Sequence, residues 1–487
     1  QSLALDLPGD SKGLMEQAMA EESRRGGLHE KPQARVQVHW MISGAVACEV
    51  DATPSMRMAD IRTQVCERTG VPVEQQRLFL EGKEMSQKID FSQMGGLSCP
   101  GIQLVRCLSD PRNTNRAHFR ENLKLVEGPV GHFSRVKKIG DAIFGEVLLY
   151  KWMRPEDNGV QEVAVKCRSL DKVQQTLGKD TNEWTAHQSG QNIPHAEDAF
   201  AEIGILQYLS KQADMPVYLL KALAAFTHDS QIWLVTELAD GGELFDAVLN
   251  QRVQERHTRL YLWQTLQAVK YLHAHHIGHR DISLENLLLK DGSIRLMDFG
   301  NAVQSHSVTG QELRYFLPVG KDTYRAPECF VPRHCDTRVI VPANARAGDI
   351  IMHKGATGLY QVRLPSNAVA GKVCQAETWG YAATPGDVFA CGVCFFCMSY
   401  GNGPWVTAQL ADEFFAYVYG NRDSGLKDLL RHWGKPLLQS EAMDLLLSML
   451  RVDPLCRPSA AECLENCWLS ELAQNPVLRH QDCEMIL

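Results

Sequence analysis

The sequence predicts an α+β protein with two folded parts. It has 487 residues, of which 44% are hydrophobic and 22% charged, a composition that allows a sizeable core. Residues 33–108 contain predicted elements in the order strand, strand, helix, strand, strand, which is typical of a compact α+β layer. Residues 132–471 carry an ordered series of short motifs at the ends of predicted strands and helices. We therefore expect a small first domain and a larger second one.

Three further segments are polar. Residues 1–32, which include "EESRRGGLHEKPQ", offer few side chains to bury, so we expect them to be flexible. Residues 109–131 predict a linker between the two parts, and residues 472–487 predict a C-terminal tail.

Net charge, cysteine content and hydropathy limit the classes of binding partner and the cellular location that we expect. A formal net charge of -8 argues against a broad surface for nucleic acid or anionic membranes. The 15 cysteines are scattered along a long chain, which favours free thiols in a reducing compartment, and we expect a cytoplasmic or a nuclear location. The most apolar run, in "DVFACGVCFFCMSYG", has roughly 14 residues and falls short of the ~20 that cross a bilayer. No membrane partner is expected.

The first part has clear strand and helix signals. "RVQVHWMI" and "GAVACEV" alternate apolar and polar residues and predict two strands joined by a turn at Ser43 and Gly44. Ile61 and Val65 lie at helical spacing in "MADIRTQVCERTG", which ends on a glycine. "QQRLFLEGKEM" and "GIQLVRCL" predict two more strands.

This part resembles ubiquitin-like domains, which have a β-grasp fold. "VEQQRLFLEGKEM" followed by "IQLVRCL" carries the likeness. No Gly-Gly follows Leu108, so the resemblance implies a built-in interaction module and not a conjugated tag. Phe79, Gly82 and Val105 fall where the family has its apolar binding face, which implies a partner from the ubiquitin system or another protein. Phe79 could equally pack against the neighbouring domain, and the sequence leaves both alternatives open.

The second part begins with two motifs suited to phosphate binding. "IGDAIFGEV" has Gly140 and Gly145 at the ends of a Gly-x4-Gly run, with Ala142 where a third glycine would be expected. "EVAVKCRSL" then predicts a strand that ends at Lys166. "AFAEIGILQYL" predicts a helix whose Glu202 can pair with that lysine, and residues 171–199 before it predict a loop insertion.

Later motifs supply acidic and amide side chains in a fixed order. "HRDISLEN" places Asp281 and Asn286 five residues apart, and "IRLMDFGNAV" adds Asp298. "GKDTYRAPE" ends at Glu328, for which "RVDPLCRPSAAECL" offers Arg457 as a partner. In "GDVFACG", Asp387 is expected to anchor the loop that carries Asp281.

Together these motifs resemble eukaryotic protein kinases of the serine/threonine type over residues 132–471. The resemblance implies a two-lobed fold that binds ATP and Mg²⁺ in the cleft between the lobes. Asp281 would accept or orient the substrate hydroxyl, and Asn286 and Asp298 would hold Mg²⁺. The implied nucleotide-binding residues are Ile139, Gly140, Gly145, Val147, Ala164, Lys166, Glu202, Thr236, Glu237, Ala239, Glu243, Leu288 and Asp298.

The sequence departs from the family at one charged position. A lysine usually follows two residues after the catalytic aspartate, and here that residue is Ser283. The residue after Gly320 is usually a threonine that bonds this lysine, and here it is Lys321. We hypothesise that Lys321 replaces the missing cation and acts in catalysis. The alternative is that Lys321 is a solvated loop lysine and the enzyme is crippled.

Two other features bear on regulation and recognition. Arg280 has the position that in the family awaits a phosphate on the activation segment, for which Ser305, Ser307 and Thr309 are candidates. Residues 331–380 form an insert with two similar stretches, "VPANARAGDI" from 341 and "LPSNAVAGKV" from 364, that predict a small β hairpin module. The insert either docks a protein substrate or partner or is a surface elaboration.

Two functions follow. The first is an ATP-dependent serine/threonine protein kinase with a ubiquitin-like domain. The second is a nucleotide-binding pseudokinase scaffold that acts through its ubiquitin-like domain and β insert.

Overall fold

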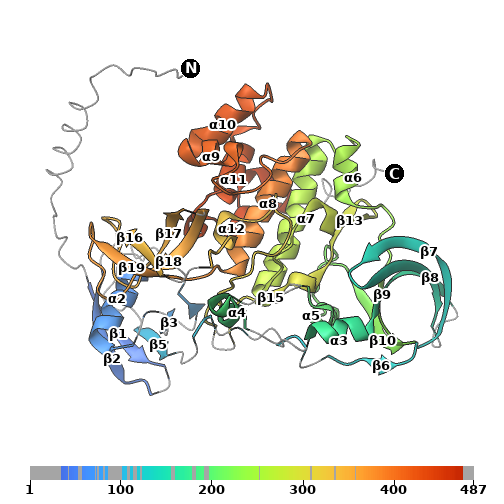
Figure 1. Ribbon diagram of the computed structural model, residues 1–487, viewed down its shortest axis with the longest axis horizontal. Helices are drawn as coiled ribbons and strands as arrows, with labels where there is room; N and C mark the ends of the chain where they lie inside the picture. The colour runs from blue at the N-terminus through green and yellow to red at the C-terminus, as the bar shows by residue number, and fades with distance from the viewer. Residues whose placement is uncertain are drawn as a thin grey trace. The chain divides into compact units, whose positions relative to one another are not determined.

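The computed structural model describes residues 34–41, 43–52, 58–71, 73, 76–80, 83–85, 101–106, 110–112, 114, 118–120, 123–154, 159–177, 182–190, 197–251, 253–307, 310–333, 336–356 and 358–474 (Figure 1). The chain divides into two compact units, Gln1–Leu108 and Ser109–Leu487. Each unit is described by itself.

The first unit is a five-stranded sheet packed on one helix. The elements are β1 (Ala34–Trp40), β2 (Val46–Ala52), α2 (Met58–Thr69), β3 (Gln76–Leu80), β4 (Lys83–Glu84) and β5 (Ile102–Arg106), and the strand order is β2-β1-β5-β3-β4. β1 and β5 are parallel, whereas the other pairs are antiparallel. Ile61 and Val65 of α2 are fully buried against Val38 and Leu78, so the predicted helical face forms the core. The predicted β-grasp fold is confirmed.

Phe79 and Val105 lie on the other face of this sheet. β3 and β5 pair Arg77 with Val105 and Phe79 with Gln103, while the intervening Leu78 is fully buried. Because side chains alternate along a strand, Phe79 and Val105 share the face opposite the core. The Arg77 guanidinium lies 4.8 Å from the Phe79 ring centroid. Gly82, the third residue of the expected binding face, lies outside the described residues.

The second unit begins with a six-stranded sheet. Its strands are β6 (Val126–Glu127), β7 (His132–Ala142), β8 (Gly145–Met153), β9 (Val160–Ser169), β10 (Ala222–His228) and β11 (Gln231–Glu237), in the order β6-β10-β11-β9-β8-β7. Val163, Val165 and Cys167 of β9 point into a core that is rich in aromatic rings. Ala164 and Lys166 alternate with them and are only partly buried on the opposite face. That opposite face is the one that carries the candidate site.

The predicted loop insertion at 171–199 is helical in part. α3 (Leu170–Leu177) and α4 (Glu183–Ser189) precede α5 (Ala199–Leu209). Asn182 caps the N-terminus of α4, where its side-chain oxygen accepts a hydrogen bond from the Thr185 amide at 3.1 Å, and Gly190, with φ 65°, caps the C-terminus. The cap and the left-handed glycine stabilise a helix of only seven residues, which is too short to give a periodicity signal in the sequence.

Helices dominate the rest of the second unit. They are α6 (Leu244–Leu249), α7 (Glu255–Ala274), α8 (Ala383–Tyr400), α9 (Glu413–Gly420), α10 (Arg422–His432), α11 (Ser440–Met449), α12 (Ala460–Leu464) and α13 (Cys467–Gln474). Two short sheets pair β12 (Ile277–Gly278) with β15 (Val303–Gln304) and β13 (Leu287–Lys290) with β14 (Ser293–Leu296). Short 3₁₀ turns are η3 (Leu284–Asn286), η4 (Phe299–Asn301), η5 (Pro327–Cys329) and η6 (Pro454–Cys456).

The apolar run with three cysteines is the buried helix α8. Cys391 and Cys394 are fully buried and Cys397 nearly so, which agrees with free cysteines acting as small apolar core residues. Over the described part of the chain, none of the helices has both the length and the apolar character needed to cross a membrane.

The insert forms a four-stranded antiparallel sheet. Its strands are β16 (Asp336–Ile340), β17 (Ile350–Gly355), β18 (Gly358–Arg363) and β19 (Val373–Thr378), in the order β16-β19-β18-β17. The two repeated stretches do not form one hairpin each. β16, which enters the first copy, pairs with β19, which leaves the second; β17, which leaves the first, pairs with β18, which enters the second.

The loops of the two copies also bond to each other by matching contacts. The Val341 amide donates to the Lys372 carbonyl, and the equivalent Leu364 amide donates to the Asp349 carbonyl. Both Val341 and Leu364 are 1% exposed, so each copy buries its first apolar residue under the other. The interleaved pairing buries both residues in one small apolar core.

The insert is anchored on the helical part of the unit. Leu359 of β18 belongs to the main core, and Met352 of β17 packs against it. Gln361 Oε1 of β18 accepts a hydrogen bond from Arg314 Nη1 at 3.0 Å.

Candidate active site

A lysine and a glutamate from different elements meet on the inner face of the six-stranded sheet. Lys166 Nζ of β9 donates to Glu202 Oε1 of α5 at 3.0 Å and lies 3.4 Å from Asp298 Oδ1. α5 is held by its N-cap Asp198, whose Oδ1 accepts from the amides of Phe200 and Ala201. The pair that the sequence predicts is therefore present and joins the sheet to the helix.

Arg168 shares this glutamate and was not predicted. Its Nη1 lies 2.5 Å from Glu202 Oε2, and the arginine is 3% exposed. Since Arg168 lies two residues after Lys166, the alternation of a strand places both cations on one face. The "VKCR" spacing was the available signal.

Asp298 lies at a strained turn beside these cations. Its φ is 64°, and its side chain accepts a hydrogen bond from the Gly300 amide. Burial alone would raise the pKa of Asp298, but Lys166 and Arg168 outweigh it and hold the pKa below its usual value. The carboxylate stays ionised.

Glu197 is a second acid in this neighbourhood that sequence reasoning missed. Burial, followed by the negative charge of Asp298, raises the pKa of Glu197 to about 7. It lies beside Gly300, where a Cβ would come within 3.2 Å of Glu197 Cγ.

The loop that carries Asp281 is anchored by α8. Asp387 of α8 accepts from the backbone amides of His279 at 2.8 Å and Arg280 at 2.7 Å, which confirms the predicted anchor. Asn286 Nδ2 donates to the Asp281 carbonyl at 2.7 Å. Asp281 Oδ1 is buried and accepts no hydrogen bond from any described residue.

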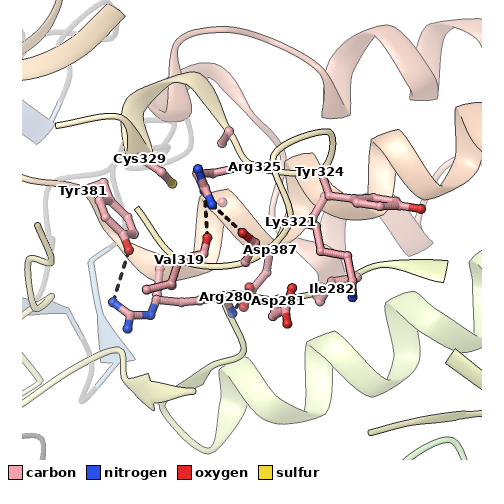
Figure 2. Close-up of a pocket in the computed structure, with 15 residues that line it drawn as sticks. Arg280, Asp281, Ile282, Val319, Lys321, Tyr324, Arg325, Cys329, Tyr381 and Asp387 are labelled. Carbon is pink, nitrogen blue, oxygen red and sulfur yellow. Dashed lines mark hydrogen bonds between the residues drawn. The ribbon is translucent and has the colours of Figure 1, made fainter. Parts of the chain in front are cut away.

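Lys321 contacts the loop that carries Asp281. Its Nζ donates to Ser283 Oγ at 2.7 Å and lies 3.5 Å from Asn286 Oδ1. Figure 2 shows the side chain extending toward the loop that carries Asp281. Burial raises the pKa of Asp281, and the charge of Lys321 is the largest effect that opposes this rise.

Gly320 allows this approach. Its φ is +81°, and a Cβ there would lie 2.5 Å from the Arg280 carbonyl oxygen and 3.2 Å from Asp281 Oδ1. Only glycine fits between the two loops at this distance, so the residue before Lys321 sets the lysine against the catalytic loop.

The remaining predicted nucleotide residues line one side of the sheet and the segment after it. Val147, Ala164 and Leu288 are partly buried, Thr236 is 7% exposed and faces Ala164 across β9 and β11, and Ile139 is 43% exposed. Gly140 and Gly145 flank the β7–β8 turn, in which Phe144 has φ 62°. Such a row of apolar side chains beside charged ones suits a nucleotide base next to its phosphates.

Two acidic residues, one at the end of β11 and one in the segment that follows, differ in their surroundings. Glu237 Oε2 accepts from Lys290 Nζ at 2.6 Å and its Oε1 accepts from the Lys221 amide at 3.1 Å, so both carboxylate oxygens are bonded within the unit. Glu243 lies at the start of α6 and bridges to Leu288. Burial, followed by Asp246 and Glu285, raises the pKa of Glu243.

The donor set fits Mg²⁺. Asp298 offers an ionised carboxylate and Asn286 an amide oxygen, and hard oxygen donors of this kind are what magnesium takes. Lys166 lies beside Glu202 and Asp298, an arrangement suited to binding phosphate and a metal ion.

Two families match the chain. Residues 133–340 match the protein kinase domain family, and residues 44–95 match the ubiquitin family. Along the sequence, the chain carries a ubiquitin-family domain followed by a protein kinase domain. The kinase match ends where β16 ends, so the remainder of the insert lies beyond it.

Curated relatives are serine/threonine protein kinases. "CBL-interacting serine/threonine-protein kinase 3" of Arabidopsis thaliana is 25% identical over 361 residues, 73% of this chain and 63% of its own length. "Probable serine/threonine-protein kinase MARK-C" of Dictyostelium discoideum is 26% identical over 343 residues, 70% of this chain and 33% of its own length. "Serine/threonine-protein kinase SIK2" of Gallus gallus is 35% identical over 136 residues, 28% of this chain and 16% of its own length. This chain thus spans less than two thirds of each of these relatives.

The kinase domain also contains the predicted pair that closes the segment after Lys321. Glu328 and Arg457 are both fully buried side chains, joined by two hydrogen bonds of 2.5 and 2.6 Å. Arg457 Nη1 further donates to the Pro385 carbonyl of α8 at 3.0 Å.

Proposed function

We propose that the chain is an ATP- and Mg²⁺-dependent serine/threonine protein kinase in which Lys321 supplies the cation that Ser283 lacks. The observation that carries the proposal is the 2.7 Å hydrogen bond from Lys321 Nζ to Ser283 Oγ. Because Lys321 contacts Ser283, an ammonium group carried by residue 321 lies close to where a lysine at residue 283 would carry its own.

The roles follow from charge and exposure. Lys166 binds phosphate oxygens, oriented by Glu202, and Asn286 and Asp298 hold Mg²⁺, which neutralises charge on the phosphates when bound. The Asp281 carboxylate accepts the proton of a substrate hydroxyl while the hydroxyl oxygen bonds to the γ-phosphorus and the bond from that phosphorus to ADP breaks. Lys321 stabilises the negative charge that spreads over the transferred group.

The test is radiolabelled phosphate transfer to a generic protein substrate. The wild-type chain should transfer phosphate and Asp281→Asn should not. Lys321→Ala should lower kcat by about 10²- to 10³-fold, as for other lost transition-state donors, with little change in ATP affinity. Lys211→Ala, an exposed lysine after α5, is the matched control and should be unaffected. Equal turnover of Lys321→Ala and wild type would reject the cation role.

The second candidate is a nucleotide-binding pseudokinase scaffold. The replacement at Ser283 favours it, because one family cation is missing from its usual place. Under this proposal the wild type would transfer no more phosphate than Asp281→Asn.

The domain limits remain those expected from the sequence. We place the ubiquitin-like domain at 33–108, the linker at 109–131 and the kinase domain at 132–471, with a cytoplasmic or nuclear location. Phe79 and Val105 provide an apolar face for a protein partner, which Phe79→Ala in a binding assay would weaken.

A further inference from the structure

One carboxylate enclosed in the kinase domain has no role in the proposed chemistry. Glu183 of α4 is 0% exposed, and its Oε1 accepts a hydrogen bond from Arg280 Nη1 at 3.0 Å. Arg280 directly precedes Asp281, and its Nε donates to the Asn301 carbonyl at 2.9 Å. The Glu183 carboxylate of α4 therefore contacts the loop that carries Asp281, although Glu183 and Arg280 are 97 residues apart in sequence.

The second oxygen of Glu183 holds a different segment. Oε2 accepts from the backbone amides of Phe316 at 2.9 Å and Leu317 at 3.0 Å. The Tyr381 hydroxyl completes the group, since it donates to the Leu317 carbonyl at 2.6 Å and accepts from Arg280 Nη1 at 3.1 Å (Figure 2 shows the tyrosine and arginine). Glu183 thus ties the loop with Asp281 to the segment that reaches Lys321 four residues after Leu317. Hydrogen bonds to an ionised carboxylate are the stronger kind.

The helix that carries Glu183 is itself held on two sides. Asn182 Nδ2 donates to the carbonyls of Arg112 at 3.0 Å and Thr114 at 3.2 Å, and the Arg112 guanidinium lies 4.2 Å from the Trp184 ring centroid. On the other side, His187 Nε2 donates to the Pro332 carbonyl at 2.7 Å, at the start of the insert. The linker and the insert root therefore fix the position of the carboxylate.

The hydroxyls suggested as phosphorylation sites are poorly placed to supply an anion instead. Ser305 is 2% exposed, and its Oγ lies 2.9 Å from His306 Nδ1. Ser307 Oγ accepts from the Gln311 amide at 3.1 Å, and Thr309 lies outside the described residues. The arginine that would receive a phosphate is 9% exposed and already bonded to Glu183.

We propose that Glu183 is a positioning residue: a permanent anion that holds the segment around Phe316 and Leu317 against Arg280, so that turnover does not need a phosphate added to that segment. The proposal rests on the proposed kinase function for its effect on turnover. The ordering of the segment is measured separately.

The experiment compares the full chain with Glu183→Gln, which keeps the shape and removes the charge, and with Glu183→Asp, which keeps the charge. Gln188→Ala, an exposed change on the same helix, is the control. Amide hydrogen exchange of peptides spanning 314–325 should speed up at least about tenfold in Glu183→Gln and stay unchanged in Gln188→Ala. Exchange in α7 and α8 should not change, because those helices do not contact the carboxylate through any described bond.

Turnover provides the second readout. Glu183→Gln should lower kcat by about 10- to 100-fold, as misplacement of reacting groups does, with KM for ATP within about threefold of wild type. Glu183→Asp should recover part of the loss. Phosphatase treatment of the wild type should leave both kcat and exchange at 314–325 unchanged.

Each failure has its own signature. If the wild type and Asp281→Asn transfer phosphate equally, the proposed kinase function fails, and the exchange data still decide whether Glu183 orders the segment. Unchanged exchange in Glu183→Gln, or loss of wild-type protection or turnover after phosphatase treatment, overturns the proposal. If Glu183→Gln does not fold, Glu183→Asp and the phosphatase treatment give the same decision.

Discussion

Moving the charge back to its usual loop is the sharpest perturbation of the site. In the double variant Ser283→Lys with Lys321→Thr, an ammonium group again stands beside Asp281 but is attached to the catalytic loop. Because Ser283 Oγ and Lys321 Nζ are 2.7 Å apart, the relocated charge can occupy nearly the same point.

The magnitude follows from Coulomb's law. At an effective dielectric constant of about 20, two unit charges about 4 Å apart interact by ~4 kcal/mol, and a shift of 1–2 Å changes this by about 1 kcal/mol. One kcal/mol corresponds to roughly a fivefold change in rate. The double variant should therefore retain kcat within about tenfold of wild type, whereas Lys321→Ala alone should lose about 10²- to 10³-fold.

The assay is the initial rate of phosphate transfer at saturating ATP across a pH series. Asp281 must be ionised to accept a proton, and Lys321 lowers its pKa. Removing that charge in Lys321→Ala should raise the pKa of Asp281 and move the acid limb of the kcat profile to higher pH. The double variant should bring the limb back, and Ser283→Ala, which keeps the ammonium, should stay near wild type. A double variant as slow as Lys321→Ala, or identical acid limbs in all four proteins, would refute the reasoning.

Two further predictions concern stability. In the folded state, burial and then the negative charge of Asp298 raise the pKa of Glu197 from 4.5 to about 7, so the stability that the neutral form contributes is lost as pH rises from about 4.5 to about 7. Glu197→Gln, which removes the buried charge, should therefore raise Tm clearly more at pH 8 than at pH 5.5 in thermal melts without nucleotide. An equal shift at both pH values would contradict the assigned ionisation. Arg457→Met leaves the fully buried Glu328 carboxylate without its cation and should lower the free energy of unfolding by about 3–5 kcal/mol in urea melts. Arg431→Met, at a pair with 60% of the arginine side chain exposed, is the control and should change it by less than about 1 kcal/mol; similar losses in both variants would argue against the buried pair.

The sequence predicted those parts of the site that depend on local order along the chain. Strand alternation placed Lys166 on a strand, helical spacing placed Glu202 on a helix, and the two were expected to pair; the structure has them 3.0 Å apart. The resemblance to protein kinases also implied the buried partners Glu328 and Arg457, and the structure joins them. The exchange of charge between Ser283 and Lys321 could also be proposed from sequence, because the resemblance to protein kinases implies a lysine at the first position and a threonine at the second.

By itself, then, the amino-acid order determined the kinds of elements, their succession and the residues at their ends, since these depend on contacts within a few residues. Only the tertiary structure decided the long-range contacts that no motif predicts. Glu183 meets Arg280 because a short capped helix is held between the linker and the insert, and no local pattern encodes that contact. The interleaved pairing of β16 with β19 is likewise decided by burial of Val341 and Leu364, which depends on the whole insert closing around them.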